Sequence, residues 1–242
     1  MVGIVPLLGI VLGCGTDQRI DALPPDAVLV AFGNSLTAGT GAPQGASYPS
    51  VLAQLTGYTV HNAGVPGELS REGLQRLPRV LQRYEPDVVL LCHGGNAFLQ
   101  SRSTAELKKH LRAMIHQIRG AGARVVLLGV PRFDLGLSTH PLYGELAEEF
   151  DLPAELDALD AILATPRQKS DMIHPNAAGY ARLARTVDAL LTNSTSAAEL
   201  HLPLHTASAQ GRVTGNRKIP PGPENGHGGI LCRLESIRRF EY

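Results

Sequence analysis

The chain has 242 residues, which is enough for one α/β domain with a sizeable core and additional segments. Lysine and arginine number 22, as do aspartate and glutamate, so the zero formal net charge favours neither a nucleic-acid partner nor electrostatic binding to an anionic membrane. Three cysteines are too few for a disulfide framework and show no zinc-site spacing with the histidines, so we expect no metal.

The first segment is an uncharged apolar run at residues 2–13 that ends at Cys14. The run is too short to span a bilayer as a helix, but it has the length of the apolar region of a signal peptide. Its end, VLGC, resembles a bacterial lipobox, although no lysine or arginine precedes the run. We expect residues 1–14 to direct export to the periplasm, with Cys14 lipidated and holding the protein on a membrane. The alternative is a cytoplasmic protein with an apolar N-terminus.

Residues 15–26 are polar and proline-rich and are expected to form a linker. Short apolar runs follow at residues 27–32, 58–61, 87–92 and 124–130. Because these runs are continuous rather than alternating, they are typical of strands buried on both faces of a parallel sheet.

Helical patterns separate the apolar runs. A capping box at residues 103–106 begins a helix that ends at Gly120, and an earlier helix contains Pro78, which is expected to kink or restart it. The last helix is expected to begin at Pro175. A fifth strand is expected within residues 151–164, but that segment reads as partly helical, so the strand should be short. This alternation of strands and helices predicts a doubly wound α/β sandwich.

The periodic pattern stops near residue 193. Residues 194–242 are rich in serine, glycine, proline and histidine, and we expect them to form a disordered tail.

Ser35 follows the first predicted strand, in the string GNSL. Ligands bind outside the carboxyl ends of the strands in an open α/β sheet, and a serine there can present backbone N–H groups to an oxyanion. A lone serine after a strand is more often a turn or helix-cap residue. The chain contains no GxSxG string, which excludes the nucleophile elbow of the α/β-hydrolases.

Three further segments change the interpretation of Ser35. They are NAGVPGE at residues 62–68, HGGN at 93–96 and DMIHPN at 171–176. Together with Ser35 they supply a hydroxyl, a backbone N–H, an amide, an imidazole and a carboxylate, which are the groups needed for acyl transfer.

The four segments resemble, in order, the sequence blocks of the SGNH (GDSL-type) hydrolases, and the resemblance covers residues 27–193. The strings SLTAGTGAP and KSDMIHPNAAGY are most similar to the small bacterial branch of arylesterases, thioesterases and lysophospholipases. The resemblance implies a three-layer α/β/α sandwich with a parallel, flavodoxin-like sheet. It also implies a serine ester hydrolase that uses no cofactor.

The resemblance assigns a role to each matching residue. Ser35 would be the nucleophile, His174 the general base and then the acid, and Asp171 the group that orients the imidazole. The backbone N–H groups of Ser35 and Gly67 and the side-chain amide of Asn96 would form the oxyanion hole. A helix beginning directly after His174 would favour the neutral imidazole through its positive end.

Two positions depart from the family pattern. Asn34 stands where GDSL has aspartate, and Ala97 replaces the aspartate that usually follows GGN. Neither position belongs to the triad or the oxyanion hole. If Asp171 did not serve as the triad carboxylate, Asp157 and Asp160 would be the next candidates.

We expect the substrate to be a small ester, with short-chain acyl or aryl esters cleaved through an acyl-enzyme. Acyl thioesters, lysophospholipids and acetylated carbohydrates are alternative substrates that the same groups could cleave. A lipoprotein that has kept the fold as a binding module is the alternative outside enzymes. The sequence does not indicate an oligomeric state.

Overall fold

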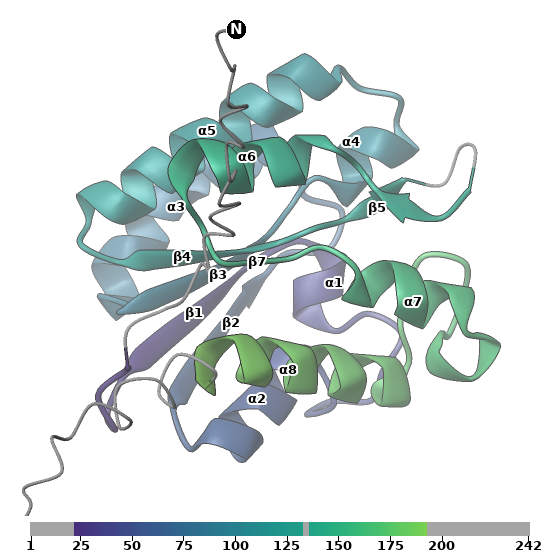
Figure 1. Cartoon of the computed structure of the whole chain (residues 1–242), viewed down its shortest axis with the longest axis horizontal. Helices are drawn as coiled ribbons and strands as arrows, with labels where there is room; N and C mark the ends of the chain where they lie inside the picture. The colour runs from purple at the N-terminus through teal and green to yellow at the C-terminus, as the bar shows by residue number, and fades with distance from the viewer. Residues whose placement is uncertain (1–21, 133–135, 193–242) are drawn as a thin grey trace, which may run out of the picture. The chain divides into compact units, whose positions relative to one another are not determined.

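A five-stranded parallel sheet forms the centre of a computed structural model, which describes residues 22–132 and 136–192 (Figure 1). The strand order is β2-β1-β3-β4-β7, and every neighbouring pair is parallel. The strands are β1 (Val28–Gly33), β2 (Thr59–Gly64), β3 (Val88–Cys92), β4 (Arg124–Leu128) and β7 (Ala154–Glu155). This is the flavodoxin-like order, so the predicted fold is confirmed.

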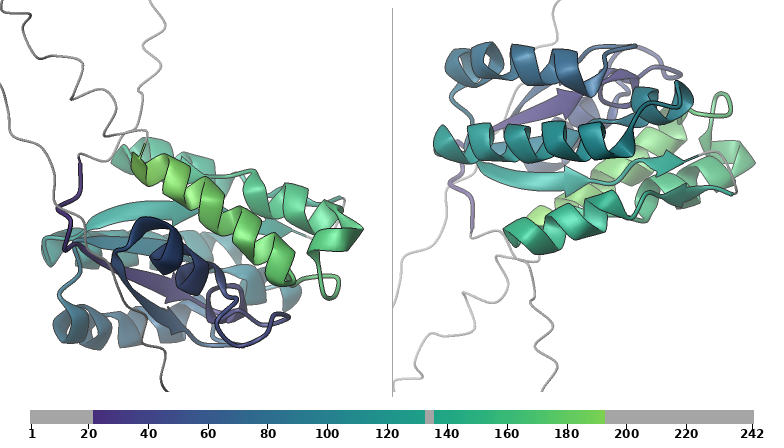
Figure 2. Two further views of the ribbon diagram at one scale, coloured as in Figure 1. Left: turned by 90° about the horizontal axis from the view of Figure 1, so that it is seen from below. Right: turned by 90° about the horizontal axis from the view of Figure 1, so that it is seen from above.

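Helices cover both faces of the sheet and complete the three layers (Figure 1). One layer contains α2 (Tyr48–Thr56), α7 (Ala158–Ala164) and α8 (Ala177–Thr192), and the other contains α3 (Ser70–Tyr84), α5 (Thr104–Gly120) and α6 (Leu142–Phe150). Figure 2 shows α2 and α8 in front of the sheet from below, and α3, α5 and α6 in front of it from above.

Several short elements connect the layers at the carboxyl ends of the strands. They are α1 (Ser35–Ala38), α4 (Gly95–Leu99), the 3-10 helix η1 (Pro166–Gln168) and a hairpin of β5 (Pro131–Arg132) and β6 (Ser138–Thr139). None of these short elements has enough residues to show a periodic pattern in the sequence, and none was predicted.

The central strands form the core. Residues 29–32 of β1 and 88–92 of β3 have no exposed surface. The core also includes one face of α5, where Leu107, Leu111, Met114, Ile115 and Ile118 are all buried. Burial of one such side chain stabilises the fold by roughly 1.5–3 kcal/mol, so the central strands provide a rigid base for the loops that follow them.

A single helix, α3, runs through Pro78, so the helix does not restart at this residue. Proline removes one hydrogen bond inside a helix, which costs about 3 kcal/mol. Leu77, Val80 and Leu81 on the same helix are buried against the core, and that packing offsets the lost bond.

The start of the last helix also differs from the prediction. Pro175 pairs with Lys169 in an isolated antiparallel bridge, and α8 begins two residues later, at Ala177. The Asn176 side chain accepts hydrogen bonds from the N–H groups of Ala178 and Gly179, as an N-cap does. The cap residue is therefore asparagine, and Pro175 ends the preceding loop.

The second strand is longer than predicted. It pairs with β1 as far as Gly33 and Gly64, so Asn62 and Ala63 belong to the strand and not to the loop after it. The short fifth strand is as predicted, because β7 has two residues and the helix α7 follows it.

The predicted export signal, Cys14, most of the linker and the tail lie outside the described residues, so the division of the chain into these segments stays a prediction. Among residues 22–132 and 136–192, no helix has the length and apolarity needed to cross a membrane.

Candidate active site

Ser35 is the first residue of α1, directly after the carboxyl end of β1. The Asn34 side chain caps this helix, since its oxygen accepts a hydrogen bond from the Leu36 N–H at 3.3 Å. An asparagine oxygen caps a helix as well as an aspartate oxygen does, which explains how the chain tolerates the change from the family residue. The Ser35 N–H, in the first turn, has no acceptor within the helix.

His174 and Asp171 meet Ser35 although 139 positions separate Ser35 from His174 in the sequence. The His174 Nε2 atom lies 3.1 Å from Ser35 Oγ, and Nδ1 lies 2.8 Å from Asp171 Oδ2. Ionised Asp171 can only accept, so His174 Nδ1 carries hydrogen, and in the neutral ring Nε2 is then the acceptor that faces the hydroxyl. The structure therefore brings the three predicted triad residues together in the order that acyl transfer needs.

Hydrogen bonds fix the Asp171 carboxylate within its own loop. Its Oδ1 accepts from the backbone N–H groups of Ile173 and His174, each at 2.8 Å, which leaves Oδ2 for the imidazole. Partial burial alone would raise the pKa of Asp171, but hydrogen bonds from the His174 ring and these two N–H groups lower it below its ordinary value. Asp171 thus stays ionised, although its side chain is 53% exposed.

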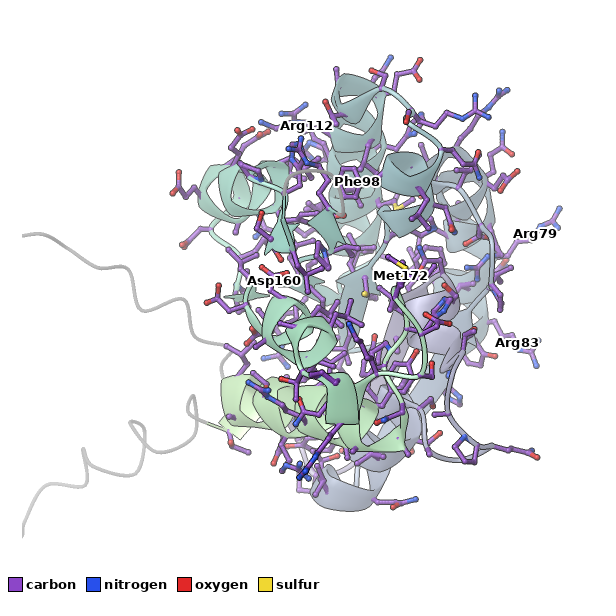
Figure 3. All side chains as sticks on the ribbon, turned by 90° about the vertical axis from the view of Figure 1, so that its right-hand side faces the viewer. Arg79, Arg83, Phe98, Arg112, Asp160 and Met172 are labelled. Carbon is purple, nitrogen blue, oxygen red and sulfur yellow. The ribbon has the colours of Figure 1, made fainter. Side chains whose placement is uncertain are left out.

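The other candidate carboxylates are placed elsewhere. Asp160 accepts hydrogen bonds from the backbone N–H and the hydroxyl of Thr139, and Asp157 precedes α7. Figure 3 shows the separation of Asp160 from Met172, the neighbour of Asp171. Of the three carboxylates, Asp171 is the one that contacts His174.

The helix that was predicted to begin directly after His174 begins further along the chain. The residue lies three positions before the first residue of α8, and a helix dipole acts mainly within the terminal turn. The backbone of the loop holds His174 instead, because its carbonyl accepts a hydrogen bond from the Ser170 N–H at 2.9 Å.

Two of the three predicted oxyanion donors border one cavity. Ser35 and Asn96 line it together with His174. Asn96 Nδ2 donates to the Glu68 carbonyl at 2.9 Å, and an amide nitrogen has a second hydrogen available. Gly67 does not line this cavity, but it directly precedes Glu68. Its φ of +80° is a conformation that favours glycine, and its N–H has no hydrogen-bond acceptor within the described residues.

The cavity beside Ser35 is small and largely apolar. Its volume is about 20 Å³. Besides the polar groups above, its lining includes Leu36, Leu99, Val130, Pro131, Leu163 and Ile173. Leu99 in this lining is 48% exposed, and Met172, which precedes Ile173 in the chain and is labelled in Figure 3, is 78% exposed. The site therefore has a confined apolar recess next to the hydroxyl and a more open apolar rim.

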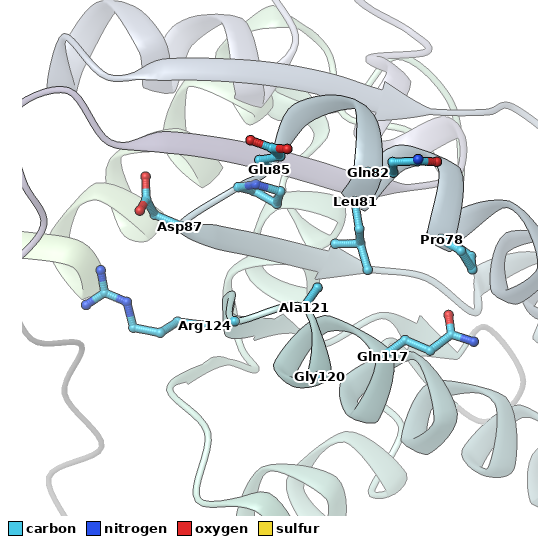
Figure 4. A pocket seen from close by; sticks show the side chains of 11 residues that line it. Pro78, Leu81, Gln82, Glu85, Asp87, Gln117, Gly120, Ala121 and Arg124 are labelled. Atoms are coloured by element: carbon cyan, nitrogen blue, oxygen red, sulfur yellow. The ribbon is translucent and has the colours of Figure 1, made fainter.

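A larger hollow of about 830 Å³ lies at the opposite end of the sheet (Figure 4). Its lining comes from the ends of α3 and α5 and from residues such as Asp87 and Arg124 at the starts of strands. Asp87 accepts a hydrogen bond from the Val28 N–H at 2.8 Å, which is a structural contact between strands. The volume of this hollow exceeds that of the Ser35 cavity, but Ser35 and His174 are at the other edge of the sheet.

Cys92, the last residue of β3, is a buried free cysteine. Burial raises the pKa of the Cys92 thiol to about 12, so this cysteine is not a reactive thiolate. Among the described residues, no group of three or more histidine, cysteine, aspartate or glutamate side chains is arranged to hold a metal ion.

Three polar residues beneath the site were missed by the sequence reasoning. Glu68 and His93 are buried, and Arg76 on α3 reaches Glu68. His93 is fully buried, with its Nε2 atom 3.2 Å from Glu68 Oε2. The signal available in the sequence was a glutamate directly after Gly67, the glycine predicted to be an oxyanion donor, but no motif marked Arg76 or His93 as its partners.

The chain matches the model of the GDSL-like Lipase/Acylhydrolase family over residues 31–182. It is 30% identical to "Thioesterase 1/protease 1/lysophospholipase L1" of Escherichia coli strain K12, over 61% of this chain and 75% of that protein. It is 29% identical to "Esterase TesA" of Pseudomonas aeruginosa, over 66% of this chain and 85% of that protein. The solved structure of AlinE4, an SGNH-hydrolase family esterase, matches with a TM-score of 0.54 and 27% identity, over 75% of this chain and all of AlinE4.

Proposed function

The chain belongs to the GDSL-like Lipase/Acylhydrolase family and is a carboxylic ester hydrolase, and we propose that it works through an acyl-enzyme on Ser35. The observation that carries this proposal is the pair of hydrogen bonds that links Asp171, His174 and Ser35, at 2.8 and 3.1 Å. A protein that only binds a ligand would not need an imidazole aligned with a serine hydroxyl in this way.

Acylation begins when His174 Nε2 takes the Ser35 hydroxyl proton while Oγ attacks the ester carbonyl carbon. The carbonyl oxygen gains negative charge and is stabilised by the N–H groups of Ser35 and Gly67 and by the Asn96 amide. The intermediate then expels the alcohol, which leaves with the proton held by His174. Asp171 stabilises the imidazolium during these steps.

Deacylation uses the same groups in reverse. His174 takes a proton from a water molecule, and the resulting hydroxide attacks the acyl carbon bound to Ser35. The second tetrahedral intermediate collapses when Ser35 Oγ leaves and regains its proton from His174. The products are the carboxylic acid and the free enzyme.

The apolar recess supports a short acyl group as the preferred substrate. A volume of about 20 Å³ is little more than one water-sized probe occupies, so only the first carbons of an acyl chain can enter. Longer chains would lie along the exposed Leu99 and Met172. The name of the Escherichia coli relative includes thioesterase and lysophospholipase, and acyl thioesters are the second substrate class, because the recess contacts only the acyl part.

Pre-steady-state kinetics with a chromogenic acetyl ester tests the proposal. We expect a burst of chromophore equal to the enzyme concentration if deacylation is slower than acylation. Replacing Ser35 by alanine should lower kcat by about 10⁴- to 10⁶-fold, since covalent catalysis is lost. Near-normal turnover by a folded Ser35→Ala variant would exclude Ser35 as the nucleophile. Parallel assays on acyl-CoA and acetylated sugars would rank the substrate classes.

We also propose that residues 27–193 form the hydrolase domain and that Cys14 is lipidated after export. Support for the first boundary comes from β1, which begins at Val28, and for the second from α8, which ends at Thr192.

A further inference from the structure

We propose that Glu68 is a positioning residue, which Arg76 and His93 lock in place so that its carbonyl oxygen orients the Asn96 amide in the oxyanion hole. The inference rests on the proposed function, because it needs Asn96 to contact the substrate oxygen. Glu68 itself touches no reacting atom and would act through Asn96.

The Glu68 carboxylate is held from two sides. Arg76 Nε donates to Oε1 at 2.7 Å and Nη2 donates to Oε2 at 2.8 Å, which is a bidentate ion pair. His93 Nε2 lies 3.2 Å from Oε2. Because a carboxylate only accepts, Nε2 is the ring nitrogen that carries hydrogen. Both oxygens are thus fixed, and the side chain of Glu68 is only 6% exposed.

Arg76 is fixed in turn by the strand layer. Its Nη2 also donates to the Ala63 carbonyl at 3.1 Å, and its guanidinium lies 4.3 Å from the centre of the Phe32 ring. These contacts connect the loop before α3 to β1 and β2. A shift of Glu68 would therefore have to disturb the sheet itself.

The charge of Glu68 is stabilised by this environment. Burial alone would raise the pKa of Glu68, but the hydrogen bonds and charges of Arg76 and His93 lower it from 4.5 to about 2. The carboxylate is therefore ionised, and the ion pair intact, throughout the pH range in which an ester hydrolase with a histidine base works.

The backbone of the same residue meets the active site. Asn96 Nδ2 donates to the Glu68 carbonyl at 2.9 Å, which uses one amide hydrogen and fixes the direction of the other. Anchoring Glu68 thus sets the position of the Asn96 donor.

His93 contacts Glu68 through one ring nitrogen while its other ring nitrogen is buried without a hydrogen-bond partner. Its Nδ1 is the single buried side-chain nitrogen or oxygen without a hydrogen-bond partner in the described part of the chain. A leucine would avoid that cost, which is roughly 1–3 kcal/mol for an unpaired buried polar group. Gly73 leaves the space for the contact, because a Cβ there would lie 2.5 Å from His93 Nε2.

The test is a double-mutant cycle between Glu68 and Asn96, measured as kcat and KM on one short-chain ester. Glu68→Gln keeps the size and the backbone carbonyl but removes the charge that Arg76 holds. We expect kcat to fall by about 10- to 100-fold with KM changed less than threefold, since small displacements of catalytic groups cost up to about 10²-fold. Asn96→Ala alone should cost about 10²- to 10³-fold.

The coupling separates positioning from a general loss of structure. In the Asn96→Ala background, Glu68→Gln should change kcat less than about threefold, because the amide it orients is gone. Glu149→Gln is the matched control. Glu149 forms a bidentate pair with Arg112 on the exposed side of α5 and α6, at 2.6 Å for both contacts, and its loss should leave kcat unchanged.

His93→Leu provides a second variant if Glu68→Gln does not fold. It removes the Nε2 donor together with the unpaired Nδ1, so we expect the protein to stay folded and kcat to fall with the same dependence on Asn96. If Asn96→Ala is costly but both other variants are silent, or the losses simply multiply, the positioning role is refuted and the proposed function stands. If Asn96→Ala is silent while Ser35→Ala is inactive, the Asn96 assignment and the positioning role both fail.

Discussion

Acid should weaken the fold through Glu68. The pKa of this carboxyl falls from 4.5 to about 2 on folding, and a folded-state pKa below the unfolded one stabilises the protein above the unfolded value. The difference of about 2.5 units corresponds to about 3 kcal/mol of unfolding free energy at pH 6. The contribution is lost as pH falls from 4.5 toward 2, and about 2 kcal/mol of it is gone at pH 3.

Urea unfolding of the wild type and of Glu68→Gln at pH 6 and pH 3 measures this contribution. Glutamine does not titrate, so the difference in unfolding free energy between the two proteins should shrink by about 2 kcal/mol between these pH values. Glu149→Gln serves as the control, since its exposed ion pair is screened by solvent and should give a much smaller change. Equal pH dependence for the wild type and Glu68→Gln would refute the argument that Arg76 and His93 hold a buried carboxylate.

Three further predictions follow from the site. Asp171→Asn should lower kcat by about 10³- to 10⁴-fold, because the oxygen stays on two N–H groups and the new NH₂ then faces Nδ1, which moves the ring proton to Nε2; an unchanged rate would exclude Asp171 as the triad carboxylate. Leu163→Ala should raise kcat/KM for hexanoyl relative to acetyl esters by about tenfold, since the enlarged recess buries about two more methylenes; an unaltered chain-length profile would contradict this. Cys14→Ser should release the protein from membranes and abolish incorporation of labelled palmitate, whereas an intact Met1 terminus in the soluble fraction of wild-type cells would rule out the anchor.

The sheet was predictable because its central strands are buried on both faces. The continuous apolar runs at residues 27–32 and 87–92 correspond closely to β1 and β3. The edge strand β2 was predicted too short, since its exposed positions carry polar residues such as Asn62. The predicted start of the last helix at Pro175 was also wrong. Proline suits the first turn of a helix, but this proline pairs with Lys169 in a β-bridge.

The residues assigned to the triad were found through two short motifs, GNSL at the end of β1 and DMIHPN in the loop before α8. The Glu68 network was not found, because Arg76 reaches Glu68 from α3 and His93 from the position after β3, and no sequence spacing encodes such contacts. The sequence also did not show how the structure accommodates the two residues that depart from the family pattern. Asn34 proves to be a helix cap, while Ala97 is buried, so nothing in its surroundings calls for the aspartate of the family pattern.

Mapping of a covalent adduct tests the central claim most directly. The protein would be incubated with a fluorophosphonate that reacts with activated serines, and the modified peptide identified by mass spectrometry. We predict a single adduct on Ser35, formed rapidly by the wild type and at a greatly reduced rate by His174→Ala, because the imidazole at 3.1 Å activates the hydroxyl. An adduct on another serine, or labelling of Ser35 that does not depend on His174, would contradict the proposed mechanism.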